Sequence, residues 1–342
     1  MRRFRALVLA AVLGPALAGG GGQGRGRRPY RPRSGKLNVV CTLFPYYDFV
    51  RQIGGDAVDV QLLVPAGRET HSFEPTPLDV IAVSEAEVFI YNGGESELWV
   101  EDILDAAGEA IPYRLAMIDC VETYREEYAE GMQGGHDHDH DDHDHDDHDH
   151  DHDDHDGHLH DGHEEEIEYD EHIWTSPVNA MALCRAICDT LCEADPDNAD
   201  GYRARLADYL DELQALDETF RDITDHAARR LLVFGDRFPL LYFCREYDLD
   251  YRAAFHGCAG DTEPSLATLK YLIDVVEEQE IPVVYTIELS SQKVAQAIAE
   301  TTGAQVRTFH SCQTVSRAEF DGGATYISLM TANAAALKEG LS

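Results

Sequence analysis

The sequence predicts an α/β protein with two lobes, each built on a parallel β-sheet, joined by one long helix. Apolar stretches of strand length alternate with helical patterns in both halves of the 342-residue chain, which is long enough for two domains. Between the halves, residues 197–228 carry apolar side chains at steps of three and four, the spacing of an amphipathic helix. These apolar positions are Tyr202, Leu206, Tyr209, Leu210, Leu213, Leu216, Phe220 and Ile223.

The first half is expected to form one complete lobe. Strands are predicted over residues 37–43, 58–64, 88–91 and 115–118, and helices over residues 46–53, 77–86, 97–107 and 176–192. One helix start is especially clear, because Thr76 can cap it, Pro77 suits its first position and Asp79 its first turn. We expect an N-terminal lobe over residues 37–195, interrupted by an acidic loop at 124–169.

The second half repeats the alternation after the long helix. Strands are predicted near residues 231–234, 251–255, 283–287 and 305–309, and helices near 238–247, 265–279, 291–302 and 326–341. We therefore expect a linking helix over residues 196–229 and a C-terminal lobe over residues 230–342.

The acidic loop contains a run of histidine and aspartate at residues 136–163. These 28 residues hold 12 histidines and 13 aspartates, so they have almost no apolar surface to bury. The histidines are His136, His138, His140, His143, His145, His148, His150, His152, His155, His158, His160 and His163. Imidazole suits zinc, copper and nickel, so the run predicts accessory, low-affinity binding of a transition metal. The alternative is a plain acidic linker or a tag.

The first 36 residues predict export from the cell. Arginines at positions 2, 3 and 5 precede an apolar run at 6–13, and Ala16-Leu17-Ala18 suits cleavage, so residues 1–18 are interpreted as a signal peptide. Residues 19–36 form a Gly/Arg/Pro linker. Bacterial lipoproteins place the acylated cysteine where this chain has Gly20, so lipid anchoring is not expected, and the protein should act at the cell surface or in the periplasm of a bacterium.

Charge and cysteine content exclude some classes of function. The formal charge is −38, and removing the 13 aspartates of the histidine run still leaves −38 + 13 = −25, which argues against nucleic-acid binding. Eight cysteines do not make a dense disulfide scaffold. Cys258 and Cys312 each follow a predicted strand and could form a disulfide, but the sequence leaves open whether they are joined. Cys184, Cys188 and Cys192 are interpreted as small buried side chains rather than a three-thiolate metal site.

Four polar side chains are expected to form a metal site in the cleft between the lobes. Ligands of parallel sheets bind at the carboxyl ends of the strands, and the loops there carry His71, His172, Asp236 and Glu288, two from each half. Asp236 could instead cap the following helix, and His256 is a competing third nitrogen ligand. Glu288 ends a very apolar strand, where an unpaired carboxylate would be costly.

These residues lie in motifs that resemble a known family. Residues 65–79, with Arg-Glu-Thr-His71-Ser-Phe-Glu-Pro-Thr-Pro, are similar to the first-ligand motif of bacterial metal-uptake solute-binding proteins, family 9, of ABC transporters. The motif His172-Ile-Trp-Thr-Ser-Pro-Val-Asn and the C-terminal segment 322–338 also resemble that family, whose zinc members carry a His/Asp-rich insertion. The resemblance covers roughly residues 36–342. One departure stands out, because Gly235 occupies the position where the family usually has a histidine.

The resemblance implies a two-lobed receptor, with a linking helix that allows little hinge motion, that captures a divalent ion for a membrane permease. We predict a monomeric, high-affinity zinc-binding receptor that delivers Zn²⁺ to the permease, with the histidine run as a metal antenna. The alternatives are a manganese-binding receptor of the same class and a secreted metal-buffering or adhesive surface protein. No His-Glu-x-x-His helix or activated nucleophile is present, so an enzyme is not expected.

Overall fold

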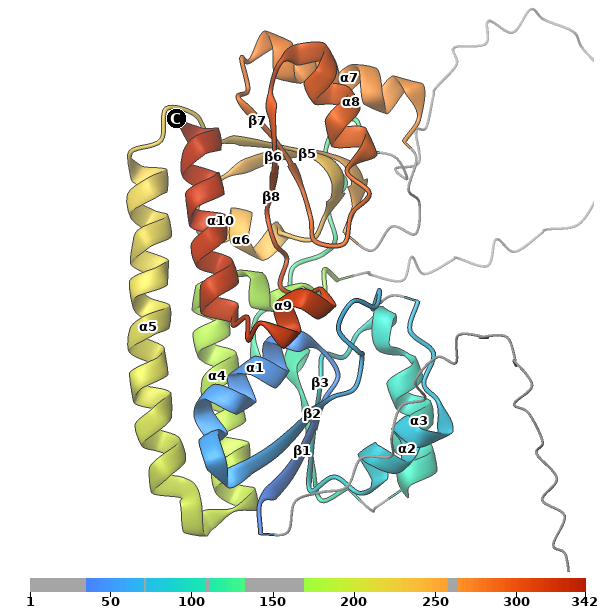
Figure 1. The fold of residues 1–342 in the computed structure, drawn as a ribbon, viewed down its shortest axis with the longest axis vertical. Coiled ribbons are helices and arrows are strands. Elements are labelled where there is room, and N and C mark those ends of the chain that lie inside the picture. Colours follow the sequence, from blue (N-terminus) through green and yellow to red (C-terminus); the bar gives the residue numbers. More distant parts are fainter. Residues whose placement is uncertain (1–34, 71, 109–110, 133–168, 258–263) are drawn as a thin grey trace, which may run out of the picture. The chain divides into compact units, whose positions relative to one another are not determined.

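Two four-stranded parallel sheets form the framework of the computed structural model (Figure 1). The structure describes residues 35–342 except 71, 109–110, 133–168 and 258–263. The predicted signal peptide, most of the predicted linker and the histidine run therefore lie outside the described residues. The first sheet has the order β2-β1-β3-β4 and the second the order β6-β5-β7-β8. The predicted fold class is confirmed.

The first lobe consists of the first sheet and the helices that pack against it. Its strands are β1 (Leu37–Cys41), β2 (Val58–Leu62), β3 (Val88–Tyr91) and β4 (Tyr113–Ala116). Its helices are α1 (Phe44–Gly54), α2 (Pro77–Ser84), α3 (Trp99–Ala107) and α4 (Pro177–Ala194). The predicted start of α2 is confirmed, because Thr76 and Asp79 form a capping box around Pro77.

The second lobe is the second sheet with its helices, and α5 (Ala199–Asp225) leads into it. Its strands are β5 (Leu231–Phe238), β6 (Asp250–His256), β7 (Val283–Thr286) and β8 (Gln305–Thr308). Its helices are α6 (Leu241–Glu246), α7 (Leu266–Glu278), α8 (Lys293–Thr302) and α10 (Tyr326–Leu341). The short helix α9 (Arg317–Asp321) lies against the first lobe instead, where Phe320 packs on Tyr47 of α1 (Figure 1). In Figure 1, α5 lies beside α4 and α10, and it contacts both.

The predicted boundary between the first strand and first helix of the second lobe is wrong. We expected the strand to end at residue 234 and a helix to begin near 238, but β5 continues to Phe238 and α6 begins only at Leu241. Pro239 explains the difference, since a proline disfavours helical backbone in the residue before it and so keeps Phe238 extended. The β5 strand also bulges between Phe234 and Arg237, which places Gly235 and Asp236 at the bulge.

One hydrophobic core runs through both lobes. A single cluster of buried side chains includes residues of β1, α1, α4, α5, β5, α6, β7 and α10, while smaller clusters fill the outer side of each sheet. The fully buried Trp174 lies in the shared cluster, and its Nε1 donates a hydrogen bond to the Ser311 carbonyl at 2.8 Å. Tyr326 donates through its hydroxyl to the Trp174 carbonyl at 2.8 Å. Continuous packing of this kind opposes large hinge motion between the lobes.

Within the described residues, no helix combines the length and apolar character needed to cross a membrane.

Candidate metal centre

The predicted ligands all fall on segments that follow strands or approach the carboxyl edge of a sheet. His71 belongs to the loop between β2 and α2, and its own position lies outside the described residues. His172 directly precedes the short helix η5 (Ile173–Thr175), Asp236 lies at the bulge of β5, and Glu288 follows β7. Because β5 and β7 are paired in the sheet, Asp236 and Glu288 emerge side by side.

His172 is fixed by an acidic neighbour two residues earlier in the chain. Its imidazole is 1% exposed, and its Nδ1 lies 3.1 Å from Asp170 Oδ1, which also accepts the His172 backbone N–H at 2.8 Å. Burial alone would lower the pKa of His172, but the negative charges of Asp170, Glu171 and Glu126 raise it above its usual value. The carboxylate favours the tautomer with the proton on Nδ1, which leaves the Nε2 lone pair to bind a metal.

Asp236 points towards the segment that follows β7. Its carboxylate accepts the Arg237 backbone N–H at 2.9 Å through Oδ1 and the Ile287 backbone N–H at 3.3 Å through Oδ2. Burial raises the pKa of Asp236, and hydrogen bonds from Ser290 and from the backbone partly offset the effect. The alternative role as a helix cap is not observed, because Leu240 occupies the N-cap position of α6.

The structure explains why Gly235 cannot be the histidine that the family usually has at this position. A Cβ added to Gly235 would lie 2.5 Å from Ala295 Cα and 2.6 Å from Ala295 N on α8, both of them backbone atoms. Only glycine allows α8 to approach β5 this closely. Asp236 is therefore the first residue of this segment that can offer a metal-binding group.

Glu288 is buried, and its carboxylate is held from both sides by one residue. It is 8% exposed, with Oε2 accepting the Ser311 backbone N–H at 2.8 Å and Oε1 accepting the Ser311 hydroxyl at 2.5 Å. Leu289 and Cys312 flank this pair with φ angles of 57° and 65°, a left-handed conformation unusual for such residues. The carboxylate is thus not left unpaired in the apolar interior.

His256, the competing nitrogen ligand, is engaged elsewhere. Its Nδ1 lies 2.9 Å from Glu126 Oε1, and its ring lies against that of Tyr128 at 5.2 Å between centroids. It is nonetheless near His172, since a Cβ on the neighbouring Gly257 would lie 3.1 Å from His172 Cε1.

In the part of the chain that the structure describes, no three His, Cys, Asp or Glu side chains are grouped to hold a metal ion. The predicted set includes His71, which is outside that part, so the four-residue set stays a prediction. The same holds for the twelve histidines of residues 136–163. Cys312 is buried and Cys258 lies outside the described residues, so their disulfide stays a prediction as well. Cys184, Cys188 and Cys192 are buried in α4.

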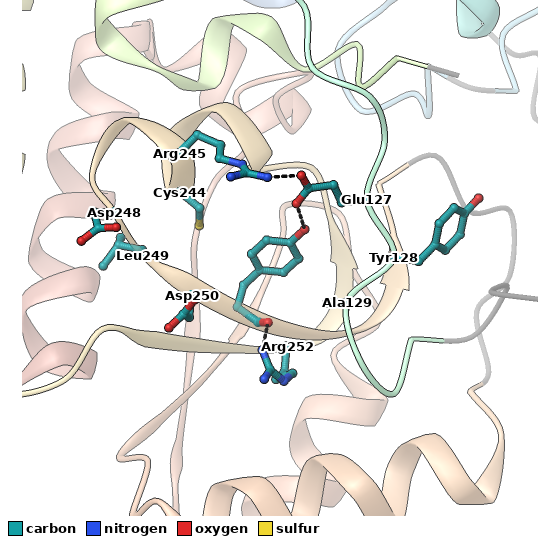
Figure 2. A pocket seen from close by; sticks show the side chains of 10 residues that line it. Glu127, Tyr128, Ala129, Cys244, Arg245, Asp248, Leu249, Asp250 and Arg252 are labelled. Atoms are coloured by element: carbon teal, nitrogen blue, oxygen red, sulfur yellow. Dashed lines mark hydrogen bonds and ion pairs between the residues drawn. The ribbon is translucent and has the colours of Figure 1, made fainter. Parts of the chain in front are cut away.

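A cavity of ≈ 350 Å³ lies away from the predicted ligands (Figure 2). Residues 127–129, which precede the histidine run, line it together with parts of α6 and β6. Glu127 forms an ion pair with Arg245 there and accepts a hydrogen bond from the Tyr251 hydroxyl at 3.4 Å. The carboxylate therefore attaches the chain before the histidine run to the second lobe.

Sequence reasoning missed three residues that position or face the site. Asp170 could have been found from its spacing of two residues before His172. Ser311 follows a predicted strand at its carboxyl end, by the same rule that selected Glu288. Arg237 pairs with Glu69 at 2.9 Å, and no sequence signal connects these distant residues.

Two parallel-sheet lobes, one shared core and candidate ligands at the strand ends define a bilobal solute-binding protein. The chain matches the family described as ZnuA, "Zinc-uptake complex component A periplasmic", over residues 39–340. It belongs to this family of zinc-uptake substrate-binding proteins, whose members are binding proteins and not enzymes. The predicted family is confirmed.

Individual relatives agree with this assignment. The chain is 30% identical to the high-affinity zinc uptake system protein ZnuA of Bacillus subtilis over 314 residues, covering 90% of this chain and 88% of that protein. It is also 30% identical to the zinc-binding lipoprotein AdcA of Streptococcus pneumoniae over 306 residues, but spans only 56% of AdcA. The crystal structure of the Zn(II)-bound ZnuA-like domain of AdcA has a TM-score of 0.69 and 27% identity, covering 90% of this chain and 99% of that one.

Proposed function

We propose that this chain is the extracytoplasmic receptor of a zinc-uptake ABC transporter, which captures Zn²⁺ and delivers it to a membrane permease. Family membership supports the class of function, since the family is described as the periplasmic component of a zinc-uptake complex. The Bacillus subtilis relative is named as a high-affinity zinc uptake system protein, and this name supports both zinc as the bound ion and import as the function. We expect the receptor to act as a monomer.

The proposed ligands are His71, His172, Asp236 and Glu288. The observation that carries the proposal is the Asp170–His172 pair, because a carboxylate on one imidazole nitrogen is the arrangement that prepares the other for a metal. Asp236 and Glu288 add two negative charges that balance the dication. Four protein ligands leave little room for a reactive water, which suits binding more than catalysis.

Asp236 is preferred over His256 as the third ligand. Asp236 lies on β5, which pairs with β7, and Glu288 follows β7 in the chain. By contrast, Nδ1 of His256 already contacts Glu126. Two carboxylates make the set tolerant of manganese, so Mn²⁺ is kept as an alternative. The Irving–Williams order favours zinc at equal availability, and so would the imidazoles of the histidine run.

The histidine run is proposed to be an accessory antenna that raises the local metal concentration near the site. Its flanks support this role. Arg125 and Tyr169 pair as an isolated antiparallel bridge, and Asp170 and His172 follow at once. The two segments that flank the histidine run are therefore paired close in the chain to the proposed ligand His172.

The test is a zinc titration of the full chain against a competing chelator. Wild type should show one tight site and several weak ones, and His172→Ala should weaken the tight site at least a hundredfold while leaving the weak ones. His226→Ala is the matched control, because this histidine has a side chain that is 78% exposed at the end of α5. A tight site that survives His172→Ala, and disappears only when the histidines of the run are replaced, would contradict the proposal.

A further inference from the structure

Arg237 is a positive charge placed among the carboxylates of the proposed metal site. Its Nη2 lies 2.9 Å from Glu69 Oε2, which brings together the β5 bulge of the second lobe and the loop that carries His71 in the first. It directly follows Asp236 in the chain. Among the ion-paired arginines of the described residues it has the least exposed side chain, at 20%, followed by Arg252 at 29%.

Its charge is maintained by acidic groups. Burial lowers the pKa of Arg237, but the hydrogen bond and charge of Glu69, with the charges of Asp236 and Glu288, raise it above the usual value. The guanidinium therefore stays charged throughout the physiological pH range. Without Arg237, Glu69 would lose its cationic partner beside Asp236, whereas Glu288 would keep a second nitrogen partner, because His310 Nδ1 lies 3.6 Å from Glu288 Oε2.

We propose that Arg237 is a resident counter-cation of the metal-free site, which pairs with Glu69 beside Asp236 and repels the incoming dication, so that zinc is bound less tightly and released faster. This inference rests on the proposed function. It makes Arg237 a residue that tunes affinity without coordinating the metal, since guanidinium carries no free lone pair. A receptor that passes its ion to a permease needs release as well as capture, and Arg237 favours release.

The same charge should act oppositely on the two states of the protein. It stabilises the metal-free form by pairing with Glu69, and it destabilises the zinc-loaded form by like-charge repulsion. By linkage, a residue that favours the free form over the bound form lowers affinity by the corresponding factor. Removal of the charge should therefore tighten zinc binding while making the metal-free protein less stable.

The experiment measures zinc affinity by chelator competition, zinc dissociation by stopped flow, and the melting temperatures of metal-free and zinc-loaded full-length protein. Arg237→Gln removes the charge but keeps a donor for Glu69. We expect about tenfold tighter binding and a correspondingly slower dissociation, the order of magnitude expected when one screened unit charge near a dication is removed. The melting temperature should fall for the metal-free form and change less, or rise, for the loaded form.

Two further variants separate the effect of the Arg237 charge from the effect of the shape of its side chain. Arg237→Lys keeps the charge and should bind zinc as wild type does. Arg245→Gln removes an arginine that pairs with Glu127 away from the site, with a side chain that is 54% exposed, and should leave zinc affinity unchanged.

Unchanged or weaker binding by Arg237→Gln would overturn the inference, and so would an Arg237→Lys variant that behaves like Arg237→Gln. Failure of the proposed function is distinguishable, because it would appear as tight binding that persists in His172→Ala.

Discussion

The two lobes hold their proposed ligands in different ways. In the first lobe, His172 depends on a side chain, because the Asp170 carboxylate orients its imidazole at 3.1 Å. In the second lobe, Asp236 and Glu288 are held largely by the main chain, through N–H groups of residues 237, 287 and 311. A backbone donor survives most substitutions, whereas a side-chain acceptor can be removed by one. The histidine side of the site should therefore be the more sensitive to mutation.

Among the contacts between the halves, Trp174 is the largest fully buried side chain, and its removal should have the largest effect on stability. Trp174 is fully buried two residues after His172, packs edge-on to Tyr46 at 5.9 Å and donates to the carbonyl of Ser311, the residue that holds Glu288. We expect Trp174→Ala to lower the free energy of unfolding of the metal-free protein by about 3–5 kcal/mol, the usual cost of emptying so large a buried site. Denaturant unfolding measures this loss.

Trp99→Ala provides the matched control. Trp99 is only partly buried and packs against Phe73 at 5.0 Å within the first lobe. Its replacement should cost clearly less than that of Trp174. Equal losses would mean that the contact between the halves contributes little to stability.

The stability of the protein should also depend on pH, through a buried acid in the first lobe. Glu97 is buried and accepts backbone N–H groups of Asn92 and Gly93, and Asn92 Nδ2 donates to the Glu171 carbonyl at 3.1 Å, next to His172. Burial raises the pKa of Glu97 to about 7. An acid whose pKa is higher in the folded state than in the unfolded one stabilises the fold at low pH, and this contribution is lost as the pH rises through the folded value.

We therefore expect wild type to lose up to about 3 kcal/mol of stability relative to Glu97→Gln between pH 4.5 and 8, from the difference between a pKa of about 7 and the usual 4.5 at 1.36 kcal/mol per unit. Unfolding free energies of both proteins across this range measure the difference. A constant difference between them would show that Glu97 is already ionised at the acid end.

The fold was predictable from sequence because its signals are local. Strand-length apolar stretches, the Thr76 capping box and the three- and four-residue spacing of α5 need no knowledge of distant neighbours. The end of β5 was mispredicted although Pro239 is a local signal for it. The need for glycine at position 235 could not be predicted, because it follows from the approach of α8, a contact between residues 60 positions apart (295 − 235 = 60).

The candidate site also rests on local signals, and its ligand set stays a prediction. The rule that ligands follow parallel strands identified Asp236 and Glu288, and the Asp170–His172 spacing is visible in the chain. The pairs Ser311–Glu288 and Arg237–Glu69 exist only once the strand order and the contact between the lobes are known, so no local pattern could reveal them.

The difference between the lobes can be tested directly with one substitution on each side. Asp170→Asn removes the charge that orients His172, and we expect zinc affinity to fall about 10- to 100-fold, the usual consequence of losing such a partner. Ser311→Ala removes only the hydroxyl from Glu288 and keeps the backbone N–H at 2.8 Å, so the loss should be a few-fold. Chelator competition on both full-length variants gives the ratio of the two losses in zinc affinity. If Ser311→Ala weakened zinc binding as much as Asp170→Asn, the main chain would not be what holds the second-lobe carboxylates, and the two halves of the site would be equally dependent on side chains.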